Sequence, residues 1–393
     1  MSPGEGGGLV KIAVAPNAFK GSLTASHAAD CIARGLLKAM PDCVVVKVPV
    51  ADGGDGTARA VADATGGRWL DCAVSDPLGR RVRAGFGLTG DGRTAVVEMA
   101  LASGLALLKP PEQNPFLTST FGTGELIRAA LDLQVDKILV GIGGSATTDG
   151  GMGMARALGI LFLDERGHEL DGMGGTLTRV AHIDAGGLDA RLKRVTVEVA
   201  CDVVNPLFGP TGAARVYGPQ KGATPAMVDE LDAGLEHLAK VIARDLGVDV
   251  SRLPGGGAAG GLGAGLVAFL GGCLCPGAEV VIRVCGLREE LEGCDLVITG
   301  EGRLDGQTVF GKAPAGVAKV AGEAGVPVIA ICGSLGKDVG RVHEAGIDAF
   351  FSALEEPVAE AELPVRGPGM LEQCAEQVGR LLVLGQSRLR GTP

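Results

Sequence analysis

The stretch KIAVAPNAFKGS at residues 11–22 joins a short apolar run to a loop that carries an amide, a lysine and a hydroxyl. Four later stretches follow the same plan: VVVKVPVADGGDGT (44–57), KILVGIGGSATTDGG (137–151), VTVEVACDVVNP (195–206) and LVITGEGRLDGQTVFGK (296–312). In open α/β sheets, ligands bind just beyond the carboxyl ends of the strands, where loops and helix N-termini converge. Five such strand ends therefore predict an enzyme that acts on a polar, anionic substrate.

The order of the expected elements predicts two domains. At 393 residues, the chain is longer than a single hydrophobic core usually supports. Residues 12–15 and 44–50 are expected as strands joined by a long helix at about residues 23–40, and such a crossover implies parallel strands. Residues 70–99 have the pattern of a meander with tight turns at DPLG and TGDG, so we place a domain boundary near Arg68.

The middle of the chain is expected to hold strands at residues 138–141 and 195–200 and helices at about 124–133 and 225–246. The segment GGGAAGGLGAG at residues 255–265 is too rich in glycine to favour a helix start, and we expect it to pack closely against another backbone or a ligand.

The alternation of strands and helices returns after Cys294, with strands expected at residues 296–299, 328–332 and 349–353. We therefore predict an α/β fold with a discontinuous, Rossmann-like parallel-sheet domain formed by residues 1–68 and 294–393. An inserted α/β domain with a mixed sheet would comprise residues 69–293. The active site is expected in the cleft between the two domains.

Composition excludes several classes of function. The net charge of −10 and the absence of a basic run argue against nucleic-acid binding. Ten cysteines include no C-x-x-C pair, which favours reduced thiols over a zinc site. The N-terminal residues MSPGEGGGLV do not resemble a signal peptide, and no apolar run has membrane-spanning length. We expect a cytoplasmic protein without a membrane partner, and the oligomeric state stays open.

GIGGSATTDGG also fits the dinucleotide fingerprint G-x-G-x-x-A through Gly141, Gly143 and Ala146. However, Thr147 and Asp149 place a hydroxyl and a carboxylate where the fingerprint's helix should begin. These groups suit phosphate and Mg²⁺ better than a nicotinamide pyrophosphate, so we favour a phosphate loop over a dehydrogenase.

GQTVFGKA, residues 306–313, nearly matches the P-loop pattern, but Ala313 replaces the Ser or Thr that would bind Mg²⁺. The preceding strand also ends about six residues too early. This segment is therefore not expected to be a Walker loop, although Lys312 and the backbone could still contact phosphate.

Charged residues collect at the other strand ends. Lys20 and the N-cap hydroxyl expected at Ser22 would form an anion site at a helix N-terminus. Asp52 and Asp55 could orient a metal or take a proton from a hydroxyl. Further acids lie at the remaining strand ends: Asp202 near Asn205, and Glu301 near Asp305. Carboxylates beside lysines are what Mg²⁺-assisted phosphoryl transfer needs.

Nine ordered stretches closely resemble the type 1 glycerate kinase family (glycerate 2-kinase), from about Lys11 to beyond Ser334. They are APNAFKGSLTA (15–25), PVADGGDGT (49–57), EMALASGLALL (98–108), TSTFGTGELI (118–127), GGSATTDGG (143–151), CDVVNPLFGPTGAA (201–214), YGPQKGA (217–223), PGGGAAGGLGAG (254–265) and DLVITGEGRLDGQTVFGK (295–312). The resemblance implies ATP-dependent phosphorylation of the 2-hydroxyl of D-glycerate, giving 2-phosphoglycerate and ADP. The chain departs from the family pattern at Ala18, Asp55 and Thr148, where the family often has Ser, Glu and Asn.

The residue types at the strand ends suggest the following catalytic roles. Lys20, Asp52 and Asp202 are the predicted catalytic residues: Lys20 would hold anionic oxygens, and Asp52 would orient or deprotonate the attacking hydroxyl. Mg²⁺ would be held by Asp202, Glu301 or Asp305, directly or through water.

Substrate or nucleotide is expected at the loop groups that surround these residues. They are Asn17, Ser22, Gly53, Gly54, Asp55, Gly56, Thr57, Gly143, Gly144, Ser145, Thr147, Asp149, Asn205, Gln307, Thr308 and Lys312. Two alternatives stay open: an NAD(P)-dependent dehydrogenase of a small hydroxy acid, and a non-catalytic protein of the same fold that binds a nucleotide or hydroxy acid.

Overall fold

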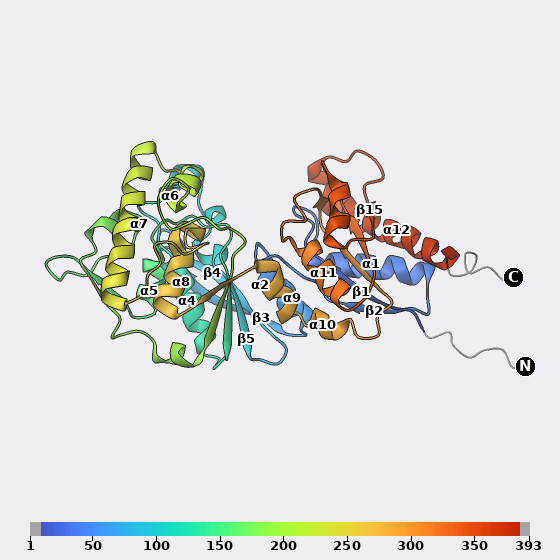
Figure 1. The fold of residues 1–393 in the computed structure, drawn as a ribbon, viewed down its shortest axis with the longest axis horizontal. Helices are drawn as coiled ribbons and strands as arrows, with labels where there is room; N and C mark the ends of the chain where they lie inside the picture. The colour runs from blue at the N-terminus through green and yellow to red at the C-terminus, as the bar shows by residue number, and fades with distance from the viewer. Residues whose placement is uncertain (1–8, 386–393) are drawn as a thin grey trace, which may run out of the picture. The chain divides into compact units, whose positions relative to one another are not determined.

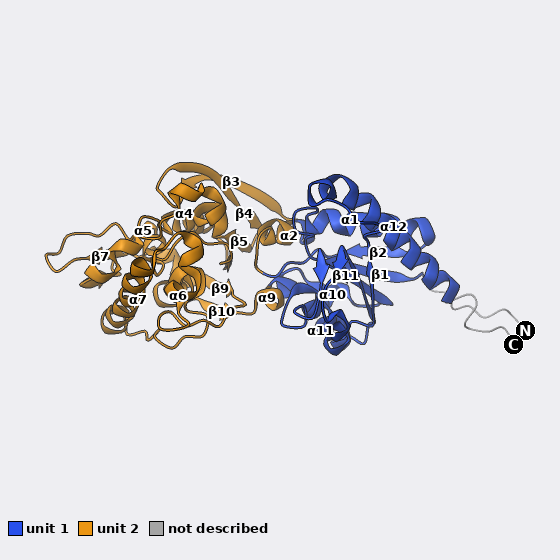
Figure 2. Cartoon of the chain, turned by 90° about the horizontal axis from the view of Figure 1, so that it is seen from above, with its two compact units in different colours: residues 1–52, 63–65, 281–393 blue, residues 53–62, 66–280 orange. Residues whose placement is uncertain are grey.

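The computed structural model describes residues 9–385 and divides into two compact units (Figures 1 and 2). Within the described residues, unit 1 consists of residues 9–52, 63–65 and 281–385. Unit 2 consists of Gly53–Ala62 and Gly66–Val280. The predicted domain limits near residues 68 and 293, and the predicted cleft, rest on the sequence pattern and stay predictions.

Five parallel strands form the sheet of unit 1, in the order β15-β13-β11-β1-β2. Ile12 on β1 pairs with Leu296 on β11 and Val45 on β2, so segments from both ends of the chain share one sheet. This confirms the predicted discontinuous parallel sheet. The strands are β1 Lys11–Pro16, β2 Val44–Lys47, β11 Leu296–Gly300, β13 Val328–Cys332 and β15 Ala349–Ser352. A short parallel pair adds β12 Arg303–Leu304 and β14 Ser334–Leu335.

Helices α1 (Ala25–Ala39) and α12 (Leu363–Leu384) lie side by side in both views (Figures 1 and 2). A glycine allows this close approach, since a Cβ at Gly35 would lie 2.2 Å from the carbonyl oxygen of Glu372. Ile32 of α1 and Leu371 of α12 join the buried core of unit 1. Unit 1 also contains α10 Leu287–Glu290 and α11 Ala313–Glu323.

The predicted N-cap at Ser22 is wrong. Thr24 caps α1, and its side chain accepts a hydrogen bond from the backbone N–H of His27. A turn in which the N–H groups of Ser22 and Leu23 donate to the carbonyl of Phe19 delays the helix start. The Ser22 hydroxyl instead donates to the carbonyl of Leu363 at 3.4 Å.

Six strands form the mixed sheet of unit 2, in the order β10-β9-β6-β5-β4-β3. The meander is confirmed, because β3, β4 and β5 pair antiparallel, whereas β5, β6, β9 and β10 pair parallel. The strands are β3 Arg68–Ser75, β4 Arg81–Leu88, β5 Thr94–Glu98, β6 Lys137–Gly141, β9 Thr196–Ala200 and β10 Cys273–Cys275. A separate antiparallel pair joins β7 Leu161–Leu163 to β8 His182–Asp184.

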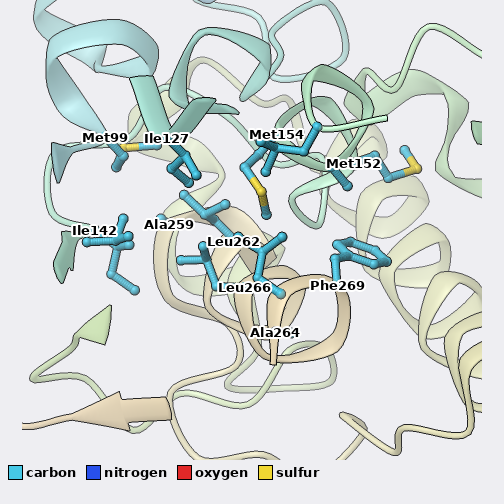
Figure 3. Close-up of a cluster of buried hydrophobic side chains, with 14 of the residues drawn as sticks. Met99, Ile127, Ile142, Met152, Met154, Ala259, Leu262, Ala264, Leu266 and Phe269 are labelled. Atoms are coloured by element: carbon cyan, nitrogen blue, oxygen red, sulfur yellow. The ribbon is translucent and has the colours of Figure 1, made fainter. Parts of the chain in front are cut away.

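The remaining α-helices are α2 Thr57–Ala64, α3 Ala100–Ser103, α4 Phe121–Leu131, α5 Met152–Ala157, α6 Ala213–Tyr217, α7 Pro225–Leu246, α8 Leu262–Leu270 and α9 Gly277–Val284. Figure 3 shows how Leu262, Leu266 and Phe269 of α8 meet Met152 and Met154 of α5 in the core of unit 2. None of the helices within residues 9–385 is both long and apolar enough to cross a membrane.

The glycine-rich segment packs tightly against another backbone, as predicted. A Cβ at Gly260 would lie 2.0 Å from the carbonyl oxygen of Thr147, and one at Gly265 would lie 2.5 Å from that of Gly150. The glycines therefore let α8 and the turn before it press directly onto the loop of residues 143–151.

Candidate active site

The loops that follow β1 and β2 in unit 1 bring Asn17 and Asp52 together. Asn17 is 8% exposed, and its side-chain amide donates to Oδ2 of Asp52 at 3.3 Å. The Asn17 oxygen accepts from the N–H of Ala18 at 2.7 Å, which fixes the orientation of the amide. The structure thus holds a carboxylate oriented by an amide at the carboxyl end of the sheet, where the sequence predicted it.

Lys20 lies on the same loop and is exposed. It lines a pocket of about 490 Å³, part of which is open solvent, together with Ser22, Phe19, Met370 and Leu371 among others. The apolar wall comes from α12, and the polar rim comes from the loop after β1. Gly302 lies against this rim, because a Cβ there would be 3.3 Å from the backbone nitrogen of Lys20.

The loop after β11 adds two acids. Glu301 is 7% exposed and accepts a hydrogen bond from the Thr308 hydroxyl at 2.7 Å. Burial raises the pKa of Glu301, the Thr308 hydroxyl and the Lys312 ammonium lower it, and the negative charges of Asp52 and Asp305 raise it. The negative charges of Asp52 and Asp305 therefore act on the Glu301 carboxylate, and a bound cation would offset them.

Asp305 is held by its own loop. Its Oδ1 accepts from the N–H of Gln307 at 2.9 Å and lies 3.7 Å from the Lys312 ammonium. Lys312 is the N-cap residue of α11, so a cation and a helix N-terminus coincide here. β11 ends at Gly300, well before Gly306, so this segment lacks the direct strand-to-loop connection of a Walker motif.

In unit 2, the loop after residue 52 is tied to Glu98 at the end of β5. Its two carboxylate oxygens accept from the N–H groups of Gly56 and Ala58, at 3.0 and 2.7 Å. Burial raises the pKa of Glu98, the two N–H donors lower it, and Asp55 raises it. Sequence analysis missed Glu98, although an acid directly after the apolar run TAVV was the available signal.

This loop packs against the loop that follows β6. A Cβ at Gly141 would lie 2.8 Å from the carbonyl oxygen of Gly53, and one at Gly144 would lie 3.5 Å from Oδ1 of Asp55. Thr57 is buried, and its hydroxyl donates to the carbonyl of Gly54 at 2.6 Å. Two of the predicted binding loops thus meet within unit 2.

The loop of residues 143–151 presents few side chains to solvent. Gly143 and Gly144 are exposed, whereas Ser145 is 8% exposed and Thr147 and Asp149 are fully buried. β6 ends at Gly141 and α5 begins only at Met152, so the glycines do not open a helix as the dinucleotide fingerprint requires.

Asp149 points into the protein. It accepts from the N–H and hydroxyl of Thr120, both at 2.7 Å, and from the N–H groups of Gly151 and Gly153, at 3.0 and 3.2 Å. These internal contacts support a role in shaping the loop. Ligand contacts by the side chains of Thr147 and Asp149 stay predictions.

The loop after β9 carries the last two predicted residues. Asp202 is exposed, and its Oδ1 accepts from the N–H of Gly277 at 2.7 Å, at the start of α9. Asn205 donates to the carbonyl of Thr211 at 2.9 Å and accepts from the Tyr217 hydroxyl at 2.7 Å. Both side chains therefore have defined orientations.

Within residues 9–385, no group of three or more His, Cys, Asp or Glu side chains forms a ready-made metal cage. Mg²⁺ usually binds through one or two carboxylates together with waters and substrate phosphates. Glu301, on which the charges of Asp52 and Asp305 act, fits the role of such a carboxylate.

The family model, the similar sequences and a similar solved structure all point to the same family. The model of the glycerate kinase family matches residues 12–383. The chain is 50% identical to the glycerate kinase of Halalkalibacterium halodurans, over 93% of this chain and 97% of that protein. It is 52% identical to the glycerate 2-kinase of Escherichia coli, over 88% and 91%. A crystal structure of a Salmonella typhimurium LT2 protein, provisionally named glycerate kinase 2, superposes with a TM-score of 0.90 at 47% identity, covering 96% of this chain and all of that one.

Proposed function

The chain belongs to the glycerate kinase family, and on that premise we propose that it transfers the γ-phosphoryl group of ATP to the 2-hydroxyl of D-glycerate. The products are 2-phosphoglycerate and ADP. The observation that carries this proposal is the group of carboxylates Asp52, Glu301 and Asp305, with Lys312 among them, at the carboxyl end of the unit 1 sheet. A dehydrogenase gains no support from the family, and its fingerprint lacks the required helix.

The reaction needs a group that receives the proton of the attacking hydroxyl. Asp52 is our candidate, because Asn17 donates to one of its oxygens and so helps to orient the carboxylate. The substrate oxygen forms a bond to the γ-phosphorus, the bond from that phosphorus to the β–γ bridging oxygen breaks, and the proton passes to Asp52. ADP leaves with the bridging oxygen.

Positive charge must offset the oxyanions of the substrate carboxylate and the phosphates. We assign this role to Lys20 at the rim of the unit 1 pocket and to Lys312 at the N-terminus of α11. Asn17 and Ser22, with Gln307 and Thr308, complete the polar lining that we propose for unit 1.

In unit 2, we propose that backbone N–H groups of the exposed glycines 143 and 144 donate to phosphate oxygens. The loop with Gly53, Gly54, Asp55, Gly56 and Thr57 supports them through its contact with Gly144 and its anchor on Glu98. Ser145 and Asn205 keep their predicted binding roles.

Mg²⁺ would be held by Asp202, Glu301 or Asp305, directly or through water. When bound, the ion neutralises charge on the phosphate oxygens and orients the nucleotide.

The decisive test is ADP release from ATP and Mg²⁺ with a panel of small hydroxy acids, followed by ³¹P NMR of the product. D-glycerate should be the preferred acceptor, and the new signal should be that of 2-phosphoglycerate. A preferred acceptor other than glycerate, or a 3-phospho product, would overturn the proposal. ADP release that does not depend on any hydroxy acid would do so as well.

A further inference from the structure

Lys221 is the most deeply buried basic residue within residues 9–385, with 1% of its surface exposed. It closes the short 3₁₀ helix Pro219–Lys221, and its ammonium donates to the carbonyl oxygen of Thr147 at 2.7 Å. Burying a lysine is costly unless the group is paired. Nothing in the proposed chemistry uses it, so this burial calls for another explanation.

The bond of Lys221 reaches the inner side of the loop whose outer side exposes Gly143 and Gly144. Gly260 crowds the same carbonyl oxygen of Thr147, since a Cβ there would be 2.0 Å from it. On the neighbouring residue, the hydroxyl of Thr118 donates to the carbonyl of Ala146 at 3.0 Å. The Thr147 carbonyl is thus held between a glycine turn and the lysine, and small shifts there would move the exposed glycines.

Lys221 also interacts electrostatically with an acidic residue of the same loop. Asp149 lies fully buried two residues further on, and it is the ionisable group whose charge acts on Lys221. Burial lowers the pKa of Lys221 to about 7, and the negative charge of Asp149 opposes that change. The side chains of Thr147 and Thr148 are also buried, and their hydroxyls have no hydrogen-bond partner within the described residues. The inner face of the loop is therefore polar, and Lys221 supplies a donor to its Thr147 carbonyl and a positive charge near Asp149.

We propose that Lys221 is a positioning residue for nucleotide binding, which holds the Gly143–Gly144 backbone in its phosphate-binding conformation through the Thr147 carbonyl. This inference rests on the proposed function of that loop. It predicts an effect on ATP that glycerate does not share, because the loop that Lys221 holds is the one proposed to bind phosphate.

The first test is Lys221→Met, which keeps the length of the side chain and removes the donor and the charge. We expect KM for ATP to rise about tenfold, while KM for glycerate changes by less than about twofold. Lys240→Met is the matched control, because Lys240 is an exposed lysine of the same unit that pairs with Glu236. Equal effects on both substrates, or none on ATP in a folded variant, would overturn the proposal.

A second measurement needs neither the variant nor activity. Hydrogen exchange of wild-type residues 143–153, corrected for intrinsic rates, should show less protection at about pH 8 than at about pH 6, because the amine loses its proton across this range. Strand β6 should show no such change. Protection that is equal at both values would contradict the proposal, whereas a wild type that releases no ADP would contradict only the proposed function.

Discussion

Lys20 is the residue proposed to offset anionic charge at the rim of the unit 1 pocket. On that proposal, Lys20→Ala should lower kcat/KM about 100-fold, because one positive charge near the phosphoryl group would be lost. Steady-state kinetics with D-glycerate and ATP would measure this loss. The control is Lys38→Ala, since Lys38 is an exposed lysine of the same unit that pairs with Glu372. A Lys20→Ala variant as active as that control would refute the role.

Glu98 should make the stability of unit 2 depend on pH. Burial raises the pKa of Glu98 in the folded state, so the folded state holds the proton more tightly than the unfolded state does. Its contribution to the free energy of unfolding is therefore fully present below the unfolded pKa of about 4.5 and is lost as the pH rises through the folded value. Urea midpoints of wild type and Glu98→Gln, compared across this range, should show the wild-type advantage shrinking as pH increases. A constant or growing difference would contradict the sign.

The contact between helices α1 and α12 can be tested with two glycine-to-alanine substitutions that differ in the space around the new methyl group. Gly35→Ala should lower the free energy of unfolding by about 1–3 kcal/mol, because its Cβ would collide with the carbonyl oxygen of Glu372. Gly322→Ala on α11 is the matched change, because its Cβ would meet nothing within 4 Å. Reduced backbone freedom in the unfolded state should make that variant more stable by up to about 1 kcal/mol. Equal effects of the two changes in urea unfolding would show that this helix contact is not tight.

The elements that sequence analysis predicted are those with a clear local signal. β1, β11 and β13 are apolar runs followed by glycine or polar residues, and α7 begins at Pro225 after a capping Thr224, as expected. α12 was not predicted, because Pro364, Gly367 and Pro368 interrupt the helical pattern in its first two turns. There, packing against α1 outweighs local propensity.

The same limit applies to the site. Acids at strand ends could be read from the sequence, as Asp52 and Glu301 were. The sequence could not show whether a side chain points outward or inward, because that depends on contacts between residues far apart in the chain. Asp149 faces Thr120, and Lys221 reaches Thr147 across 74 positions of the chain. Such pairings are set by tertiary packing rather than by motifs.

For the whole molecule, Mg²⁺ should matter for turnover and not for the fold. Residues 9–385 contain no ready-made metal cage, so the ion is expected to bind with the nucleotide. EDTA should abolish ADP release, and added MgCl₂ should restore it, with the same thermal unfolding midpoint throughout. A midpoint that falls on chelation would indicate a structural metal instead.

The proposed reaction depends on proton transfer from the attacking hydroxyl to Asp52. The most direct test is kcat for ADP release by Asp52→Asn, at saturating ATP, Mg²⁺ and D-glycerate, with Asp42→Asn as the exposed control from unit 1. We predict that kcat falls at least about 100-fold in Asp52→Asn and stays at the wild-type value in the control. A folded Asp52→Asn enzyme that turns over at the wild-type rate would contradict the account.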